Sequence, residues 1–263
     1  MTETTIRDDA PATISRTDDL LHARGLRKSF GRVQALRDAE LRLPRGEVTA
    51  LIGDNGAGKS TLVRLLSGVH APDAGEILLD GAPVRFTSPQ QARLAGIETV
   101  HQNLALVEDL TVWQNLFLNR ERTRGFGPFR VLDRRAMRQQ AQEMVGSLAI
   151  NVPSVTARVR RLSGGQRQAV SIARAAGWGS KLVIMDEPTA ALGVQETKRV
   201  EELIRDLRDK GLTILLVSHN FDQVLRLADG VRVMRAGRTV AYRRTADTDG
   251  AELVALVTGA IAD

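Results

Sequence analysis

Two kinds of hydrophobic pattern alternate along the chain. Short apolar runs, some with alternating apolar and polar residues, predict β-strands. These runs cover residues 21–30, 40–44, 47–53, 76–84, 96–102, 181–187, 212–219 and 231–242. Two of the runs contain turn-forming residues, Asp80-Gly81 and Gly237, so we expect a tight hairpin at each of these places.

Helical periodicity fills much of the space between the strands. Apolar residues recur at helical spacing in residues 60–67, 133–149, 164–176, 194–210 and 250–258. After residue 180, apolar strands alternate with helices, which is typical of a parallel sheet covered on both faces. The early strands favour antiparallel pairing. We therefore expect an α/β fold with a mostly parallel sheet, an antiparallel β subdomain and an inserted helical subdomain at about 88–165.

The composition is that of a globular protein with a short polar extension. The 263 residues are 43% hydrophobic, and we expect a single domain over residues 20–263. Residues 1–19 contain five acids, two arginines and few large apolar side chains, so they predict a disordered acidic tail. No apolar run approaches the ~20 residues of a membrane span. The N-terminus lacks the apolar core of a secretion signal.

Charge and cysteine content exclude further classes of function. The chain has no cysteine, which rules out disulfides and thiolate metal sites and fits a reducing cytosol. The net charge is +6, but only five of the 37 basic residues are lysines. Such an arginine bias indicates coding composition rather than a DNA-binding face. With 3% aromatic residues there are few rings to stack on bases, so we expect no nucleic-acid partner.

The segment "GDNGAGKST" (53–61) fits the pattern of a phosphate-binding loop between a strand and a helix. Its glycines let backbone N–H groups converge on phosphate oxygens, and the following helix start adds partial positive charge. Lys59 would reach the β- and γ-phosphates, and the Ser60 hydroxyl would bind Mg²⁺. A plain strand-to-helix turn is the alternative. The candidate ATP-binding residues here are Gly53, Asn55, Gly56, Ala57, Gly58, Lys59, Ser60 and Thr61.

Two adjacent carboxylates follow the apolar run "LVIM". Asp186 and Glu187 end a predicted parallel strand, and ligands of parallel sheets bind at this carboxyl edge. Mg²⁺ and the phosphate loop would compensate the two negative charges. We expect Asp186 to hold Mg²⁺, directly or through water, and Glu187 to orient and deprotonate the attacking water. For Glu187 the alternative is an ordinary solvated charge.

The segment "LSGGQRQAVSIARA" (162–175) is similar to the signature of ATP-binding cassette (ABC) ATPases. The order of motifs also matches that family: phosphate loop, Gln102 after a strand, signature, acid pair, and His219 after "TILLVS". The resemblance covers about residues 20–260. It identifies the fold class as a phosphate-loop NTPase core and ATP with Mg²⁺ as the cofactors.

The resemblance also implies roles for residues outside the phosphate loop. Gln102 would contact Mg²⁺ or the attacking water, and His219 would hydrogen-bond the γ-phosphate. Phe30 matches the aromatic position that stacks on adenine, although a buried core phenylalanine is a rival interpretation. In the family, the signature binds ATP held by a second cassette, so the resemblance implies a homodimer. The signature residues are Ser163, Gly164, Gly165 and Gln166.

Three segments narrow the resemblance to ATPases of simple-sugar importers of the ribose, xylose and fructose type. They are "GDNGAGKST", "HQNLALVEDLTVWQNLFLNRE" (101–121) and "DEPTAALGVQET" (186–197), in which Gly193 replaces the aspartate common in the family. This branch implies membrane permease subunits, an indirect solute-binding protein, no direct sugar binding and a location at the cytoplasmic face of the membrane. The alternatives are a soluble ABC ATPase of repair, translation or regulation, and an importer of another small solute.

The resemblance further implies where the permease docks. Leu106, Val107, Leu110 and Trp113 lie in the segment that follows Gln102, and they could form the docking groove. Trp113 stands at helical spacing from Leu116, which favours a buried position for this side chain over a docking one.

Overall fold

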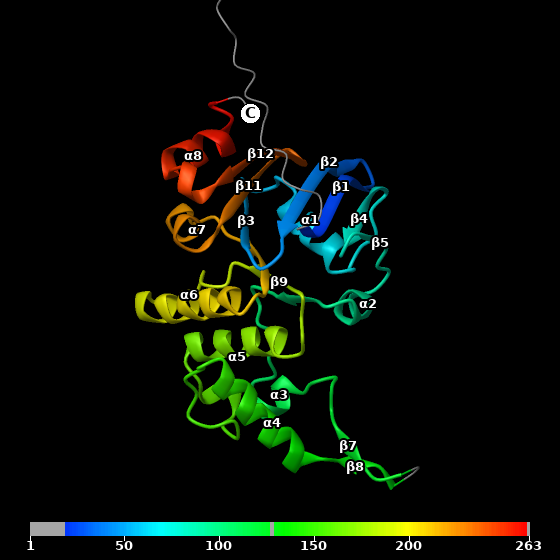
Figure 1. Ribbon diagram of the computed structural model, residues 1–263, viewed down its shortest axis with the longest axis vertical. Helices are drawn as coiled ribbons and strands as arrows, with labels where there is room; N and C mark the ends of the chain where they lie inside the picture. The colour runs from blue at the N-terminus through cyan, green and yellow to red at the C-terminus, as the bar shows by residue number, and fades with distance from the viewer. Residues whose placement is uncertain (1–18, 127–128, 262–263) are drawn as a thin grey trace, which may run out of the picture.

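A large mixed sheet forms one part of the molecule (Figure 1). The computed structural model describes residues 19–126 and 129–261. The 10-stranded sheet has the order β5-β4-β1-β2-β12-β11-β3-β10-β9-β6. Its strands are β1 (Asp19–Phe30), β2 (Val33–Pro44), β3 (Val48–Gly53), β4 (Ala74–Leu79), β5 (Ala82–Val84), β6 (Ile97–Val100), β9 (Leu182–Asp186), β10 (Thr213–Val217), β11 (Gly230–Arg235) and β12 (Arg238–Arg244). The predicted fold class is thus confirmed.

The sheet divides into a parallel and an antiparallel part. Strands β11, β3, β10, β9 and β6 are parallel neighbours, while β1 pairs antiparallel with β2 and β4. Every residue of β10 is buried, as expected for a strand covered on both faces. Both predicted hairpins are present, with Leu79 opposite Ala82 and Arg235 opposite Arg238.

The five predicted helices are all present with small shifts at their ends. The helices of the structure are α1 (Lys59–Leu66), α2 (Pro89–Leu94), α3 (Val112–Leu116), α4 (Arg134–Ser147), α5 (Gly164–Ala176), α6 (Val194–Asp209), α7 (Phe221–Leu227) and α8 (Gly250–Thr258). The sequence pattern missed α2, α3 and α7, because helices of five to seven residues are too short to show a period.

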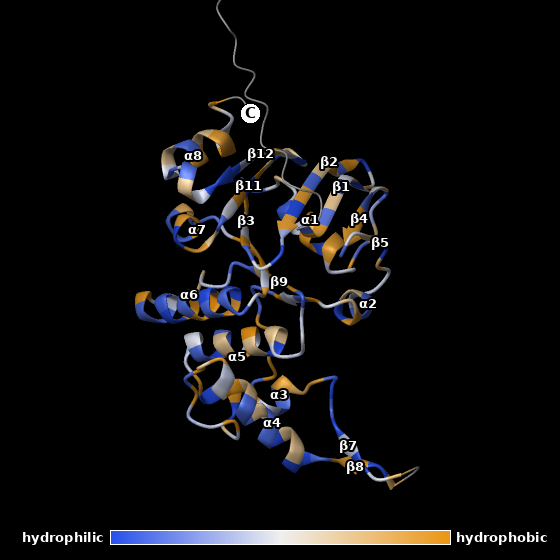
Figure 2. Ribbon diagram, viewed as in Figure 1, coloured by the Kyte–Doolittle hydropathy of each residue, from blue (hydrophilic) through white to orange (hydrophobic). Residues whose placement is uncertain are grey.

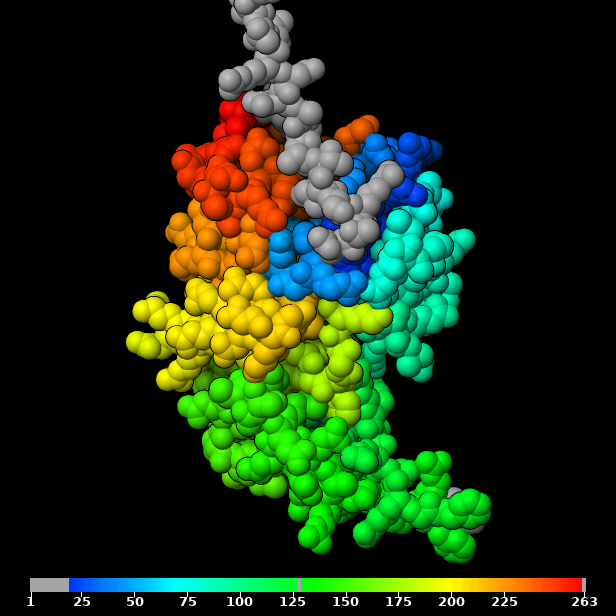
Figure 3. Space-filling model, in the orientation of Figure 1, coloured from blue at the N-terminus to red at the C-terminus, as the bar shows by residue number. Residues whose placement is uncertain are grey.

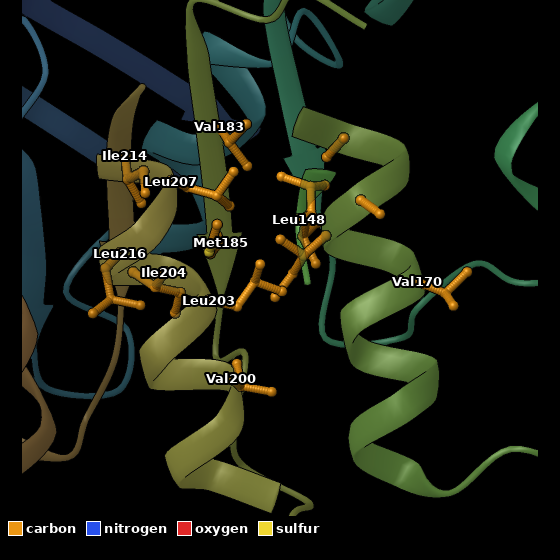
Figure 4. Close-up of a cluster of buried hydrophobic side chains, with 14 of the residues drawn as sticks. Leu148, Val170, Val183, Met185, Val200, Leu203, Ile204, Leu207, Ile214 and Leu216 are labelled. Atoms are coloured by element: carbon orange, nitrogen blue, oxygen red, sulfur yellow. The ribbon is translucent and has the colours of Figure 1, made fainter. Parts of the chain in front are cut away.

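Helix α6 covers the parallel part of the sheet with one apolar face. Its residues Val200, Leu203, Ile204 and Leu207 are buried in a cluster that α6 forms with β9, β10 and α5 (Figure 4). Full burial of each such side chain contributes roughly 1.5–3 kcal/mol. Helix α5 lies beside α6, and together they connect the sheet to the more distant helices α3 and α4.

The mainly helical part lies below the sheet in Figure 1 and also contains the hairpin β7 (Thr123–Arg124) and β8 (Val131–Leu132). Strand β6 lies within the predicted insertion of about 88–165 but belongs to the large sheet. Trp113 is 6% exposed, which confirms its predicted buried position. The predicted tail lies outside the described residues, except for Asp19, which begins β1.

Candidate active site

Four parallel strands bring the predicted catalytic segments to one edge of the sheet. Strands β3, β10, β9 and β6 are consecutive neighbours that run in the same direction. The phosphate loop follows β3, His219 follows β10, Glu187 follows β9, and Gln102 follows β6. Segments more than a hundred residues apart therefore meet at the carboxyl edge, where ligands of such sheets bind.

The phosphate loop depends on glycines at places where other residues would not fit. Gly56 and Gly58 have φ of 81° and 105°, and Gly58 is the N-cap of α1. A Cβ at Gly58 would lie 2.9 Å from the Ala35 carbonyl oxygen, and one at Gly53 would collide with the Met234 carbonyl oxygen. The loop backbone is thus fixed by neighbouring strands, which holds its N–H groups in place for an anion.

Lys59 folds back over this loop. Its Nζ donates hydrogen bonds to the carbonyl oxygens of Gly53 at 2.6 Å and Asp54 at 3.0 Å. Burial lowers the pKa of Lys59, while the carboxylates of Glu187, Asp54 and Asp186 act in the opposite direction. The lysine and the acid pair are therefore close enough to interact, as the sequence predicted for a phosphate site.

Glu187 and His219 contact each other directly. Glu187 Oε1 lies 2.6 Å from His219 Nδ1. The Glu187 side chain is 17% exposed, whereas that of His219 is 74% exposed. The carboxylate is thus largely buried, and the imidazole that contacts it is open to solvent. Glu187 also has a left-handed φ of 52°, an uncommon conformation for a residue with a side chain. Such strain is often found at functional sites.

A buried hydrogen-bond relay, missed by the sequence analysis, supports the His219 segment. Ser218 Oγ donates to Gln223 Oε1 at 3.1 Å, and Gln223 Nε2 donates to Thr189 Oγ1 at 2.7 Å. Ser218 and Gln223 are almost fully buried. The relay thus ties the segment after β10 to the one after the acid pair. No sequence signal for it exists beyond polar residues beside a buried strand.

The predicted magnesium ligands lie around the same edge. Burial raises the pKa of Asp186, and nearby His101, Lys59 and Arg64 partly oppose this rise. Ser60 lies in the first turn of α1 and is exposed. Gln102 is also exposed, and its side chain makes no hydrogen bond with the residues that the structure describes. A carboxylate, a hydroxyl and an amide oxygen fit Mg²⁺, which prefers oxygen ligands and keeps its remaining positions for phosphates and water.

Phe30 is not a core residue. Its side chain is 42% exposed at the end of β1 and packs edge-on against His70, with ring centroids 5.2 Å apart. Lys28 Nζ lies 5.7 Å from the centroid of the phenyl ring. The rival interpretation of a buried phenylalanine is therefore wrong, and the ring is accessible for stacking.

The signature residues form the start of α5. Ser163 is the N-cap, and its Oγ accepts from the Gln166 N–H at 3.3 Å, while Gln166 Oε1 accepts from the Ser163 N–H at 3.0 Å. This reciprocal capping box fixes the helix start. Helices α1 and α5 lie at different levels along the long axis (Figure 1), so the signature is far from the phosphate loop of its own chain.

Glu196 is a residue at the signature that the sequence analysis missed. The Ser163 hydroxyl, and then the backbone N–H groups of Gly165 and Gly193, lie near its carboxylate and lower the pKa of Glu196. A Cβ at Gly165 would lie 2.9 Å from Glu196 Cβ. The available signal was a glutamate three residues after the helix N-cap Gly193. The structure leaves open space beside Gly193 and does not explain the glycine there.

Comparison with known proteins agrees with this geometry. The family model "ABC transporter" matches residues 36–190. The fructose import ATP-binding protein FrcA of Rhizobium meliloti is 50% identical over 92% of this chain and 95% of its own length. The xylose/arabinose import ATP-binding protein XylG of Sulfolobus acidocaldarius is 43% identical over 91% of this chain and 94% of its own length.

Solved structures give the same result. A nucleotide-free ATP-binding cassette from an ABC transporter is 26% identical, with a TM-score of 0.78 over 92% of this chain and 95% of that chain. The ADP conformation of the cassette MJ1267 is 25% identical, with a TM-score of 0.77 over 91% of this chain and 95% of that chain. The chain belongs to the ABC transporter family and is an ATP-binding cassette ATPase. Within the described residues, no helix is long and apolar enough to cross a bilayer.

Proposed function

We propose that this chain is the ATP-hydrolysing subunit that powers import of a simple sugar through a separate membrane permease. The observation that carries the catalytic part is the Glu187–His219 contact at 2.6 Å, at the edge shared with Lys59 and the phosphate loop. The sugar class is supported by the fructose, xylose/arabinose and ribose import proteins among its relatives. The sugar itself does not bind this chain.

In this mechanism the phosphate loop and Lys59 bind the phosphates of ATP, and Phe30 stacks on the adenine. Glu187 orients and deprotonates the attacking water, and the exposed His219 imidazole hydrogen-bonds the γ-phosphate. Bound Mg²⁺ supplies charge that neutralises the phosphates. Ser60, Asp186 and Gln102 would hold the ion. Glu187 contacts His219 from a left-handed backbone position, which fits a role for it separate from that of Asp186.

Hydrolysis requires two copies of the chain. The signature start on α5 lies away from the phosphate loop of the same chain, so it serves the ATP bound by a second copy. There Ser163, Gly164, Gly165 and Gln166 present a helix N-terminus to the γ-phosphate. In a homodimer each ATP lies between a phosphate loop and a partner signature. The expected rate per chain therefore rises with protein concentration before it levels off.

The permease docks beside the Gln102 segment, which places the chain at the cytoplasmic face of the membrane. Val107 is 43% exposed and Leu110 is partly exposed, whereas Trp113 is buried and belongs to the core. The docking surface thus consists of Val107 and Leu110, with Leu106 packed partly into the core. A solute-binding protein acts indirectly, on the other side of the permease. Nucleic acid is not a partner.

The test is sugar uptake into proteoliposomes. The chain is reconstituted with the permease encoded beside its gene, and uptake of radiolabelled ribose, xylose and fructose is measured with a loaded binding protein present. We expect uptake of at least one sugar that needs ATP. Val107→Asp or Leu110→Asp should abolish uptake and leave nucleotide binding unchanged, with exposed Leu94→Asp as the control. ATPase activity without assembly on any permease would instead indicate a soluble ABC ATPase.

A further inference from the structure

The β7–β8 hairpin carries an exposed apolar cluster away from the body of the protein (Figures 1 and 3). Phe126 is 93% exposed and Phe129 is 82% exposed, and both Val131 and Leu132 are also exposed. Isolated exposed apolar residues are ordinary, but four within seven positions of one projecting hairpin indicate a binding surface.

The hairpin presents this cluster on a defined backbone. Thr123 pairs with Leu132 and Arg124 with Val131 in antiparallel register. The Phe129 N–H donates to the Phe126 carbonyl oxygen at 3.2 Å, which holds the backbones of the two phenylalanines together. Gly125 has φ of 99°, and a Cβ there would collide with the Phe129 carbonyl oxygen. The backbone that carries the two exposed rings is thus held by contacts between Gly125, Phe126 and Phe129.

Arginines surround the apolar cluster. The exposed arginines at the hairpin and at the start of α4 are Arg122, Arg124, Arg130, Arg134 and Arg135. None of the five forms an ion pair with an acid in the part of the chain that the structure describes. Two of them have neutral partners: Arg122 donates to Gln140 and Arg130 donates to Thr123. In Figure 2, hydrophilic and hydrophobic segments alternate along the hairpin.

Two acids lie in the same stretch of chain as these arginines, and each accepts a backbone hydrogen bond. Glu121 Oε1 accepts from the Asn119 N–H at 3.2 Å, and Asp133 Oδ1 accepts from the Ala136 N–H at 3.0 Å as the N-cap of α4. Residues 121–135 contain five arginines and two acids, a net charge of +3, so the hairpin has excess positive charge next to exposed phenyl rings.

We propose that the β7–β8 hairpin binds the surface of an anionic bilayer, with Phe126 and Phe129 in the head-group layer and the arginines on lipid phosphates. Aromatic side chains prefer this layer, and basic side chains beside it gain affinity from anionic lipids. The exposed phenyl rings beside these arginines match the head-group layer and phosphates of anionic lipids, which favours the membrane as the occupant.

Vesicle flotation of the full chain tests the proposal without a permease or a sugar, so its outcome is separate from that of the proposed function. The probes are phosphatidylcholine vesicles and vesicles with about 30% phosphatidylglycerol. We expect binding to the anionic vesicles only, weakened by 0.5 M salt through screening. Arg124→Gln with Arg130→Gln should lower binding roughly 10- to 30-fold, since each arginine contributes about fivefold. Phe126→Ser with Phe129→Ser should lower it at least about tenfold.

Matched controls change the same chemistry elsewhere. Arg27→Gln with Arg85→Gln removes two exposed arginines, and Leu94→Ser with Val254→Ser removes two exposed apolar side chains. Both controls should float as the unmodified chain does, and all variants should keep its ATPase rate. Anionic-vesicle binding that survives the hairpin substitutions, or equal binding to both vesicle types, overturns the proposal. If the hairpin variants bind vesicles as the unmodified chain does but no longer assemble with detergent-solubilised permease, the proposal is overturned in favour of a protein partner.

Discussion

The chain has two helix starts that can bind phosphate, and they differ in what surrounds them. At the start of α1, three separate segments meet: they carry Lys59, the acid pair Asp186 and Glu187, and His219. At the start of α5, the carboxylate of Glu196 already lies beside the Ser163 hydroxyl and the Gly164–Gly165 backbone.

The difference indicates that the two helix starts have different roles in binding ATP. Strands of one sheet bring Lys59 and the proposed base Glu187 together at the start of α1. This site can therefore bind a nucleotide before a second copy of the chain is present. At the start of α5, the carboxylate of Glu196 from the same chain already occupies the place next to the helix N-terminus. Phosphate at that start must displace or bypass a negative charge, so we expect its occupation to depend on the closing of the dimer.

The largest expected effect comes from Glu187→Gln. The amide keeps the size and the contact with His219 but cannot accept a proton, so hydrolysis should slow by at least ~100-fold. MgATP affinity should stay close to that of the unmodified chain, and ATP-bound dimer should accumulate on a sizing column. Turnover is followed by phosphate release, with Glu202→Gln on the exposed side of α6 as the control. Unchanged turnover would remove Glu187 from the mechanism.

The next effect in size comes from Lys59→Ala, which separates binding from chemistry. A charge-assisted hydrogen bond contributes about 1.5–3 kcal/mol, so the dissociation constant of MgATP should rise roughly 10- to 100-fold. Fluorescence titration with a nucleotide analogue measures this constant. Lys210→Ala, at an exposed position after α6, is the control. Equal affinity in the two variants would show that the loop binds phosphate through its backbone alone.

The sequence predicted the first region better than the second, for a physical reason. Buried strands such as Thr213–Val217 appear as apolar runs, and the phosphate loop is a contiguous motif, so both are readable locally. The prediction of 40–44 found only the end of β2, which extends over Val33–Pro44 because pairing with β1 determines its start. The Glu196 contact joins α6 to α5 and depends on helix packing, which no local pattern encodes.

The smallest expected effect comes from Glu196→Gln, and it tests the second region directly. Its lowered pKa keeps Glu196 ionised at neutral pH, and the stabilisation from this contact is lost only as the pH falls through that lowered value. Removing the charge at neutral pH should ease the approach of a partner's γ-phosphate. Since a charge near a helix terminus has a modest effect, the ATP concentration for half-maximal dimerisation should fall roughly two- to fivefold. The measurement is ATP-driven dimerisation in the slow Glu187→Gln background, with added Glu202→Gln as the matched charge control on the same helix. Weaker dimerisation in the Glu196 variant would mean that this carboxylate holds the signature in its binding geometry rather than competing for it.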